Sequence, residues 1–251
     1  MSTPLLRPSS LLLCLALVSC SVPETPSAAN HAPPFNQLAV SGNACGPAAL
    51  LNAFRYGDAR WRELGAGLPG ETDREQLSHV IRMYGLKPSG QLRGRTRWSR
   101  AGINVNDLTD LGNDLTATKF LPTLENEVLL PRSGETSAAL LARVRGMLAT
   151  SLGRGLPPVV SVRRQVLRNG GWFTVESHFI TLLRVGSTNG TGLEIDYLDP
   201  WGGRRSSGSF RVSSESALGL EAVLPVTPVG KRLVRPGEKT LVTVSAAIGR
   251  W

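Results

Sequence analysis

The chain has few thiols and few imidazoles. Of its 251 residues, only three are cysteine and three are histidine. Cys14 and Cys20 fall close to the N-terminus, so a folded body that begins after them contains Cys45 as its single thiol. Such a body forms no internal disulfide and no thiolate cluster for zinc, and the histidines show no metal-ligand spacing. The sequence therefore predicts neither a metal site nor a bound cofactor.

Several other signatures are missing. The formal net charge is +9, yet no dense basic run is interleaved with aromatic residues, and no P-loop motif occurs. Nucleic acid and nucleotides are therefore not expected as partners. The chain has no internal repeat and no second linker, and its 41% hydrophobic and 19% charged residues are typical of a globular protein. A single folded domain is the simplest organisation.

No apolar run is long enough to span a bilayer as a helix. The short apolar stretch at residues 11–18 follows Arg7 and precedes small residues, an order typical of a secretory signal. The last two residues of this stretch and the two that follow it, Leu17-Val18-Ser19-Cys20, resemble the bacterial lipobox. The resemblance implies a lipoprotein signal peptide over residues 1–19 and a lipidated Cys20 that anchors an exported protein to a membrane of the bacterial cell envelope. The alternative is a soluble exported protein cleaved nearby.

The segment after the lipobox has the composition of a tether. Residues 20–34 contain four prolines, few apolar residues and no periodicity. Such a segment is typical of an extended linker, so we expect the folded domain to cover residues 35–251. His31 lies in this tether and is expected to be solvated.

Within the domain, helical patterns come first and strand patterns come later. The helix predicted from Cys45 has Pro47 in its first turn and ends near Gly57. A second helix has the capping-box spacing of Thr72 and Glu75. This second helix is predicted over residues 73–84, and two further helices are predicted over residues 105–114 and 137–152. Strands are predicted over residues 158–162, 171–175, 177–185, 193–198, 209–212, 221–224 and 239–244. Helices followed by antiparallel strands predict an α+β domain.

Cys45 stands where a helix begins. A cysteine is a nucleophile only as the thiolate, and the free N–H groups and dipole at a helix N-terminus stabilise that anion. Gly46 is expected to leave room for a substrate to approach the sulfur. The local sequence thus predicts an activated thiol, although a packed and inert cysteine is the alternative.

His178 is the candidate base for this thiol. It lies in a predicted strand, and Asp199 ends the next one. Asn189-Gly190 between them is a strong hairpin signal. Folding the chain there places His178 opposite Asp199 or within two residues of it, where long side chains meet across strands. An Asp beside a His holds its tautomer and favours the imidazolium, which is the third role in a nucleophile–base–orienter triad.

Three short stretches follow one another along the chain. They are Asn36-Gln37-Leu38 with Asn43-Ala44-Cys45-Gly46-Pro47-Ala48-Ala49-Leu50, then Ser177-His178-Phe179-Ile180, then Leu198-Asp199-Pro200-Trp201-Gly202-Gly203. Together they resemble the bacteriocin-processing branch of the papain-like cysteine peptidases. In that family the cysteine of a C-G-P-A-like helix start attacks the peptide carbonyl. A strand histidine is the base, and the Asp of a D-P-W-G-like turn orients it.

The resemblance gives these roles to Cys45, His178 and Asp199. It implies a papain-like fold in which N-terminal helices pack on a C-terminal antiparallel sheet. A family glutamine before the cysteine donates to the oxyanion; Gln37 matches it, with Asn43 as a competitor and the Cys45 N–H as the other donor. Relatives that trim double-glycine leaders are fused to an export ATPase, which this chain lacks. We therefore expect a free-standing, membrane-tethered thiol hydrolase that cleaves peptide or isopeptide bonds in a peptide or protein substrate.

Two other functions stay open at this point. Papain-like folds also support transglutaminases, deamidases and cell-wall amidases, and fold alone does not choose among them. The third possibility is a peptidase-like lipoprotein that binds a partner without catalysis. The role of residues 61–130, where no resemblance is found, the substrate and the oligomeric state are not given by the sequence.

Overall fold

The computed structural model describes residues 32–188, 191–215, 218–225 and 233–251. The predicted signal peptide, Cys20, His31 and most of the predicted tether lie outside the described residues, as does the predicted Asn189-Gly190 turn. Within them the protein is a mixed α+β fold with five α-helices and a seven-stranded antiparallel sheet. The α+β class predicted from the sequence is confirmed. No helix of the described ranges is long and apolar enough to cross a membrane.

The helices begin where short polar side chains cap them. Asp58 caps α2, Asn104 caps α4 and Thr136 caps α5, each by accepting a backbone N–H of the first turn. The capping box predicted for α3 is present, with the Thr72 and Glu75 side chains each bonded to the other's backbone. The bounds are α1 Cys45–Arg55, α2 Ala59–Ala66, α3 Asp73–Val80, α4 Val105–Ala117 and α5 Ser137–Gly153.

Some helical details differ from the sequence prediction. The helix predicted over residues 73–84 is α-helical only to Val80 and then widens into a π-type turn, η3, at Ile81–Gly85. The N–H of Leu86 closes that turn on the carbonyl of Ile81 (2.9 Å). Helix α2 was not predicted, because its eight residues hold only two buried apolar side chains, Trp61 and Leu64.

The sheet is antiparallel throughout and folds back on itself. Its strand order is β3-β9-β4-β5-β6-β7-β8, and β8 pairs in addition with β9. Strand β9 pairs with β3 at Ala246–Gly249 and with β8 at Thr243 and Val244. The bounds are β3 Glu125–Val128, β4 Val159–Arg168, β5 Gly171–Thr188, β6 Gly192–Asp199, β7 Arg204–Val212, β8 Leu220–Val223 and β9 Thr240–Gly249.

Most strands run longer than predicted, whereas β8 has the four residues predicted for it and begins one residue earlier. The two strands predicted over residues 171–175 and 177–185 form one strand, β5, whose pairing with β4 shifts register beside Glu176. Strand β3 was not predicted because its sequence, Glu-Asn-Glu-Val, is polar and lacks alternation. A separate two-stranded hairpin, β1 Trp98–Ser99 with β2 Gly102–Ile103, was not predicted either.

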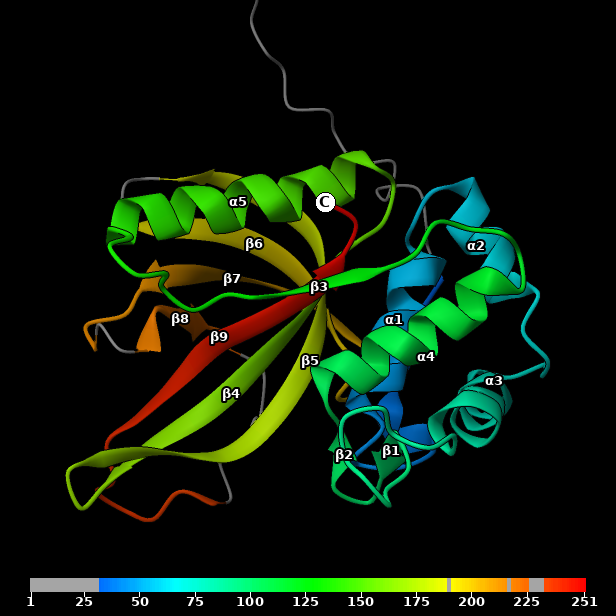
Figure 1. Ribbon diagram of the computed structural model, residues 1–251, viewed down its shortest axis with the longest axis horizontal. Coiled ribbons are helices and arrows are strands. Elements are labelled where there is room, and N and C mark those ends of the chain that lie inside the picture. Colours follow the sequence, from blue (N-terminus) through cyan, green and yellow to red (C-terminus); the bar gives the residue numbers. More distant parts are fainter. Residues whose placement is uncertain (1–31, 189–190, 216–217, 226–232) are drawn as a thin grey trace, which may run out of the picture.

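Two hydrophobic clusters lie on either side of the strand that carries His178. One draws mainly on buried residues of α1 to α4, and it includes Phe179 of β5. The other joins α5 to the strands, and it includes Ile180, the next residue of β5. Figure 1 shows the two groups of helices, with α1 to α4 beside the sheet and α5 lying across the strands. Strand β5 therefore contributes to both clusters, the one with α1 to α4 and the one with α5.

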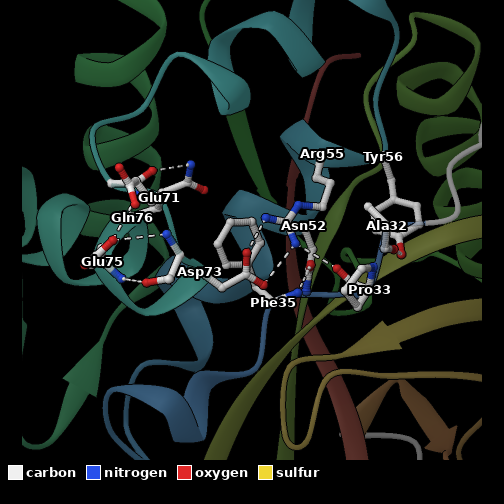
Figure 2. Close-up of polar contacts among 12 residues, drawn as sticks. Ala32, Pro33, Phe35, Asn52, Arg55, Tyr56, Glu71, Asp73, Glu75 and Gln76 are labelled. Atoms are coloured by element: carbon white, nitrogen blue, oxygen red, sulfur yellow. Dashed lines mark hydrogen bonds and ion pairs between the residues drawn. The ribbon is translucent and has the colours of Figure 1, made fainter.

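The first described residues form a strap over α1. The Tyr56 hydroxyl donates to the carbonyl of Ala32, and the Arg55 guanidinium donates to the carbonyl of Pro33 (2.7 Å). The Phe35 N–H donates to Oδ1 of the buried Asn52 (2.7 Å). Figure 2 shows these contacts together with the ion pair between Arg55 and Asp73. Contacts with the end of α1 thus already occur at Ala32 and Pro33, ahead of the predicted domain boundary at residue 35.

Candidate active site

Cys45 is the first residue of α1, as predicted. Its side chain is free and only 8% exposed. Among the five α-helices of the described ranges, α1 alone has no side-chain cap, and its first turn carries no acidic residue. The N–H groups of that turn are left for an anion, and the helix dipole favours negative charge at the sulfur.

Gly46 has a different role from the one predicted. A Cβ at this position would overlap the side chain of Ile103 and lie 3.3 Å from Leu108 and 3.4 Å from Phe179. The space beside the glycine is therefore filled by protein and is not open to substrate. Gly46 lets the β1–β2 hairpin and β5 pack closely against the start of α1.

A buried hydrogen bond fixes α1 on β5. The hydroxyl of Thr181 donates to the backbone carbonyl of Ala49 (2.7 Å), and Thr181 is fully buried. Ala49 lies one helical turn after Cys45, and Thr181 lies three residues after His178. The bond therefore holds the two elements that carry the thiol and the imidazole at one relative position.

His178 and Asp199 meet as the hairpin spacing predicts. The pair Thr181–Leu198 sets the register of β5 and β6, so Asp199 lies two residues diagonally from His178. The Nε2–H of His178 donates to Oδ1 of Asp199 (2.8 Å), and the side chains are 6% and 1% exposed. This bond leaves Nδ1 of the ring for the thiol.

The surroundings of His178 favour the protonated form of its imidazole. Burial lowers its pKa, but hydrogen bonds with Asp199 and Cys45, and the negative charge of both groups, outweigh burial and raise the pKa from 6.5 to about 10. Cys45 and His178 also line the same cleft, and Cys45 is a hydrogen-bond partner of the ring. The structure therefore brings together Cys45, His178 and Asp199, which the sequence predicted as one site.

The turn after β6 is fastened to the strap. Oδ1 of Asp199 also accepts the N–H of Trp201 (2.8 Å), which fixes the carboxylate. The carbonyl of Pro200 accepts the N–H of Gln37 (2.9 Å), and Oδ1 of Asn36 accepts the N–H of Gly202 (3.1 Å). The start of the body thus positions the group that orients the imidazole.

Gln37 lies beside the site and is fully buried. Its side-chain amide donates to the carbonyl of Gly42, and in the described part of the chain its Oε1 has no hydrogen-bond partner. Asn43 lines the cleft at Cys45, and its amide donates to the carbonyl of Arg100 in the β1–β2 turn. The proposed oxyanion role of Gln37 stays a prediction. Asn43 has a structural duty that the sequence did not reveal.

A cleft of about 280 Å³ opens at the thiol. Cys45 and His178 line it together with Trp201, and the tip of the β1–β2 hairpin forms another wall. Sequence reasoning missed this hairpin, which lies within the unmatched residues 61–130. Its only local signal is Gly102, whose φ of +95° suits a tight turn.

The described residues contain no group of three or more histidine, cysteine, aspartate or glutamate side chains placed to hold a metal ion. No protein-family model matches the chain. No curated protein matches it either.

Proposed function

We propose that the protein is a thiol-dependent hydrolase that cleaves peptide or isopeptide bonds through an acyl-enzyme on Cys45. One observation carries the proposal: a thiol at an uncapped helix N-terminus lies against an imidazole whose other nitrogen is bonded to a buried carboxylate. These are the nucleophile, the base and the orienting group that acyl transfer needs.

Acylation uses the charge already present at the site. The Cys45 thiolate attacks the carbonyl carbon, and the carbonyl electron pair moves onto oxygen to form an oxyanion. When the oxyanion collapses, the carbon–nitrogen bond breaks and the imidazolium of His178 gives its Nδ1 proton to the leaving amine. A thioester on Cys45 and a neutral imidazole remain. Asp199 keeps Nε2 protonated throughout, so Nδ1 is the nitrogen that exchanges the proton.

Deacylation reverses these roles. Neutral His178 takes a proton from water through Nδ1, and the oxygen of that water attacks the thioester carbon. The carbon–sulfur bond then breaks, releasing the carboxylic acid and restoring the thiolate–imidazolium pair. The cleft at Cys45 gives water and the acyl group access to one face of the sulfur.

We assign two donors to the oxyanion. The first is the N–H of Cys45 at the uncapped helix end. The second is the amide of Gln37: an NH2 group carries two hydrogens, and the bond to Gly42 uses one of them. Each such donor contributes about 10²- to 10³-fold to the rate in enzymes of this chemistry.

The wider assignment is part of the same proposal. The order of helices and antiparallel strands and the three short motifs support a papain-like fold of the bacteriocin-processing type, acting as a free-standing peptidase. The lipobox-like Leu17-Val18-Ser19-Cys20 supports export to a bacterial cell envelope and an anchor at Cys20. The substrate is a peptide or protein.

Alkylation and substrate profiling test the proposal together. We expect a thiolate-selective alkylator to modify Cys45 rapidly at mildly acidic pH, and about 10²-fold more slowly in a His178→Gln variant that keeps its fold. Wild-type protein should produce new peptide termini in a proteome-derived library, and Cys45→Ala should produce none. An unreactive thiol would favour a binding module. Amine incorporation or deamidation without cleavage would favour a transferase or deamidase, and release from peptidoglycan alone would favour a cell-wall amidase.

A further inference from the structure

A second cleft adjoins the one at Cys45. It has a volume of about 240 Å³ and shares Gly102, Ile103 and Phe179 with the first cleft. The shared wall is the β2 strand, together with the segment of β5 that contains His178. The two clefts therefore lie next to each other along β2 and β5.

The charged side chains that line the second cleft are all arginine. Arg95 and Arg97 come from the loop before β1, and Arg163 comes from β4. Among the described residues, no aspartate or glutamate lines this cleft. Arg97 is paired with Asp114 (2.6 Å), and Lys87 also binds that carboxylate (2.8 Å).

Arg95 and Arg163 are exposed and differ from Arg97 in their contacts. Within the described ranges, neither of them has an ion-pair partner. The backbone at Arg95 is nevertheless held, because its N–H donates to the carbonyl of Leu92 (3.0 Å) and its carbonyl accepts the N–H of Ser89 (2.8 Å). Two guanidinium groups are thus presented to this cleft without a carboxylate to neutralise them.

The arginine-bearing segment is fastened to the active-site loop. The indole N–H of Trp98 donates to the carbonyl of Asn43 (3.0 Å), and the Asn43 amide donates to the carbonyl of Arg100. Asn43 lies two residues before Cys45. The hairpin, and the cleft behind it, are therefore positioned by the residues that position the nucleophile.

We propose that this second cleft is a subsite for a carboxylate of the substrate, so that the protein prefers acidic peptides with aspartate or glutamate near the scissile bond. Guanidinium groups bind carboxylates with two parallel hydrogen bonds, which gives the recognition both charge and geometry. The first cleft has the opposite character: its acidic lining residue is Glu176, which faces Arg164 across the β4–β5 ladder. A carboxylate of the substrate is therefore better placed beside Arg95 and Arg163 than in the first cleft.

The preference for acidic peptides rests on the hydrolase proposed above, and a peptide-binding measurement tests it without turnover. The probes are short fluorescent peptides of one sequence that carry a Glu pair, a Gln pair or a Lys pair, and the protein is the full chain with Cys45→Ala. We expect the Glu peptide to bind about three- to tenfold more tightly than the Gln peptide at low salt, and the Lys peptide to bind most weakly. The preference should shrink at high salt.

Matched variants separate the subsite from the overall positive charge. Arg95→Gln combined with Arg163→Gln should abolish the preference for Glu over Gln. Arg211→Gln, which removes an exposed positive charge from β7 outside both clefts, should leave it intact. Equal binding of the Glu and Gln peptides, or a preference that survives in the double variant, would overturn the inference.

Cleavage by the wild type gives the second arm. Sites enriched in acidic residues that depend on Cys45 would support both proposals. Cysteine-dependent cleavage without any acidic enrichment would overturn the subsite and leave the hydrolase standing. An arginine-dependent binding preference without cleavage of any peptide would support the subsite and count against the hydrolase.

Discussion

At the scale of single residues, the site depends on close contacts between individual side chains. His178 lies between Asp199 and Cys45, and its ring is a hydrogen-bond partner of both. Gly46 has no Cβ because three side chains already occupy that space. Both residues were singled out from the sequence, but only the structure shows that one is placed for charge and the other for packing.

The raised pKa of His178 predicts where activity ends at high pH. The imidazolium must protonate the leaving amine, and with a pKa of about 10 it keeps its proton below that pH and loses it above. The rate kcat/KM should therefore fall as the pH rises through about 10. In Asp199→Asn this fall should begin at lower pH, and kcat/KM should drop about 10²- to 10⁴-fold, since one of the two groups that raise the pKa is neutral.

The measurement is kcat/KM from neutral pH to beyond the pKa of His178, with circular dichroism over the same range to confirm that the protein stays folded. An unchanged alkaline limb in Asp199→Asn would show that this carboxylate does not hold the proton on the ring.

Gly46→Ala tests the packing role of the glycine. The new methyl group overlaps Ile103, so we expect the free energy of unfolding to fall by about 1–3 kcal/mol. The matched control is Gly146→Ala in α5, where a Cβ meets nothing within 4 Å. That variant should gain about 0.5–1 kcal/mol from helix propensity. Urea unfolding of both variants gives the comparison, and a neutral Gly46→Ala would contradict the close packing.

At the scale of elements, the site is assembled from parts that do not touch in sequence. Helix α1 supplies the thiol, β5 the imidazole and the end of β6 the carboxylate. The strap at residues 32–37 binds α1 at one end and the turn after β6 at the other. The strap, which includes Asn36 and Gln37 of the first motif, therefore connects the helix of the thiol with the turn of the carboxylate.

Asn36 is the positioning residue of this strap. Its Oδ1 accepts the N–H groups of Leu38 (3.0 Å) and Gly202 (3.1 Å). Asn36→Ala removes both bonds, so we expect kcat to fall about three- to tenfold with little change in KM, and stability to fall by about 1 kcal/mol. Asn36→Asp keeps the accepting oxygen and should recover most of kcat.

Steady-state kinetics and thermal unfolding of the two Asn36 variants distinguish positioning from stability. If both variants lose kcat equally, or if Asn36→Ala loses stability alone, the strap does not act on the turn.

At the scale of the whole molecule, none of the helices in the described ranges has the length and apolar character needed to cross a membrane. The proposed anchor, Cys20, lies outside the described residues, whereas the proposed catalytic groups lie within them. This arrangement predicts that the anchor and the fold respond to separate mutations.

Cys20→Ser should move the protein from the membrane fraction to the soluble fraction without changing the midpoint of thermal unfolding of the body. Two or more acyl chains anchor a protein stably, so loss of the acceptor thiol should release it almost completely. Cys14→Ser is the matched control and should stay membrane-bound. Detergent partitioning of both variants provides the readout, and membrane retention of Cys20→Ser would end the lipoprotein proposal.

The sequence alone determined the features that depend on neighbours along the chain. The helix start at Cys45, the capping box of Thr72 and Glu75, the α+β order and the meeting of His178 with Asp199 follow from caps, periodicity and a hairpin spacing. Most of these features span only a few residues, and the meeting of His178 with Asp199 follows from the hairpin spacing between two consecutive strands. The lengths of the strands were underestimated, since pairing with a neighbour extends a strand beyond the residues that favour it.

Only the tertiary structure decided which distant segments meet. The bond between Thr181 and Ala49 spans 132 residues and sets the thiol against the imidazole. The β1–β2 hairpin came from a stretch without a recognisable pattern, and it is placed by Gly46 and Asn43 rather than by its own sequence. Such placements follow from burial and long-range hydrogen bonds, whose partners cannot be identified from local spacing because the chain between them imposes no fixed geometry.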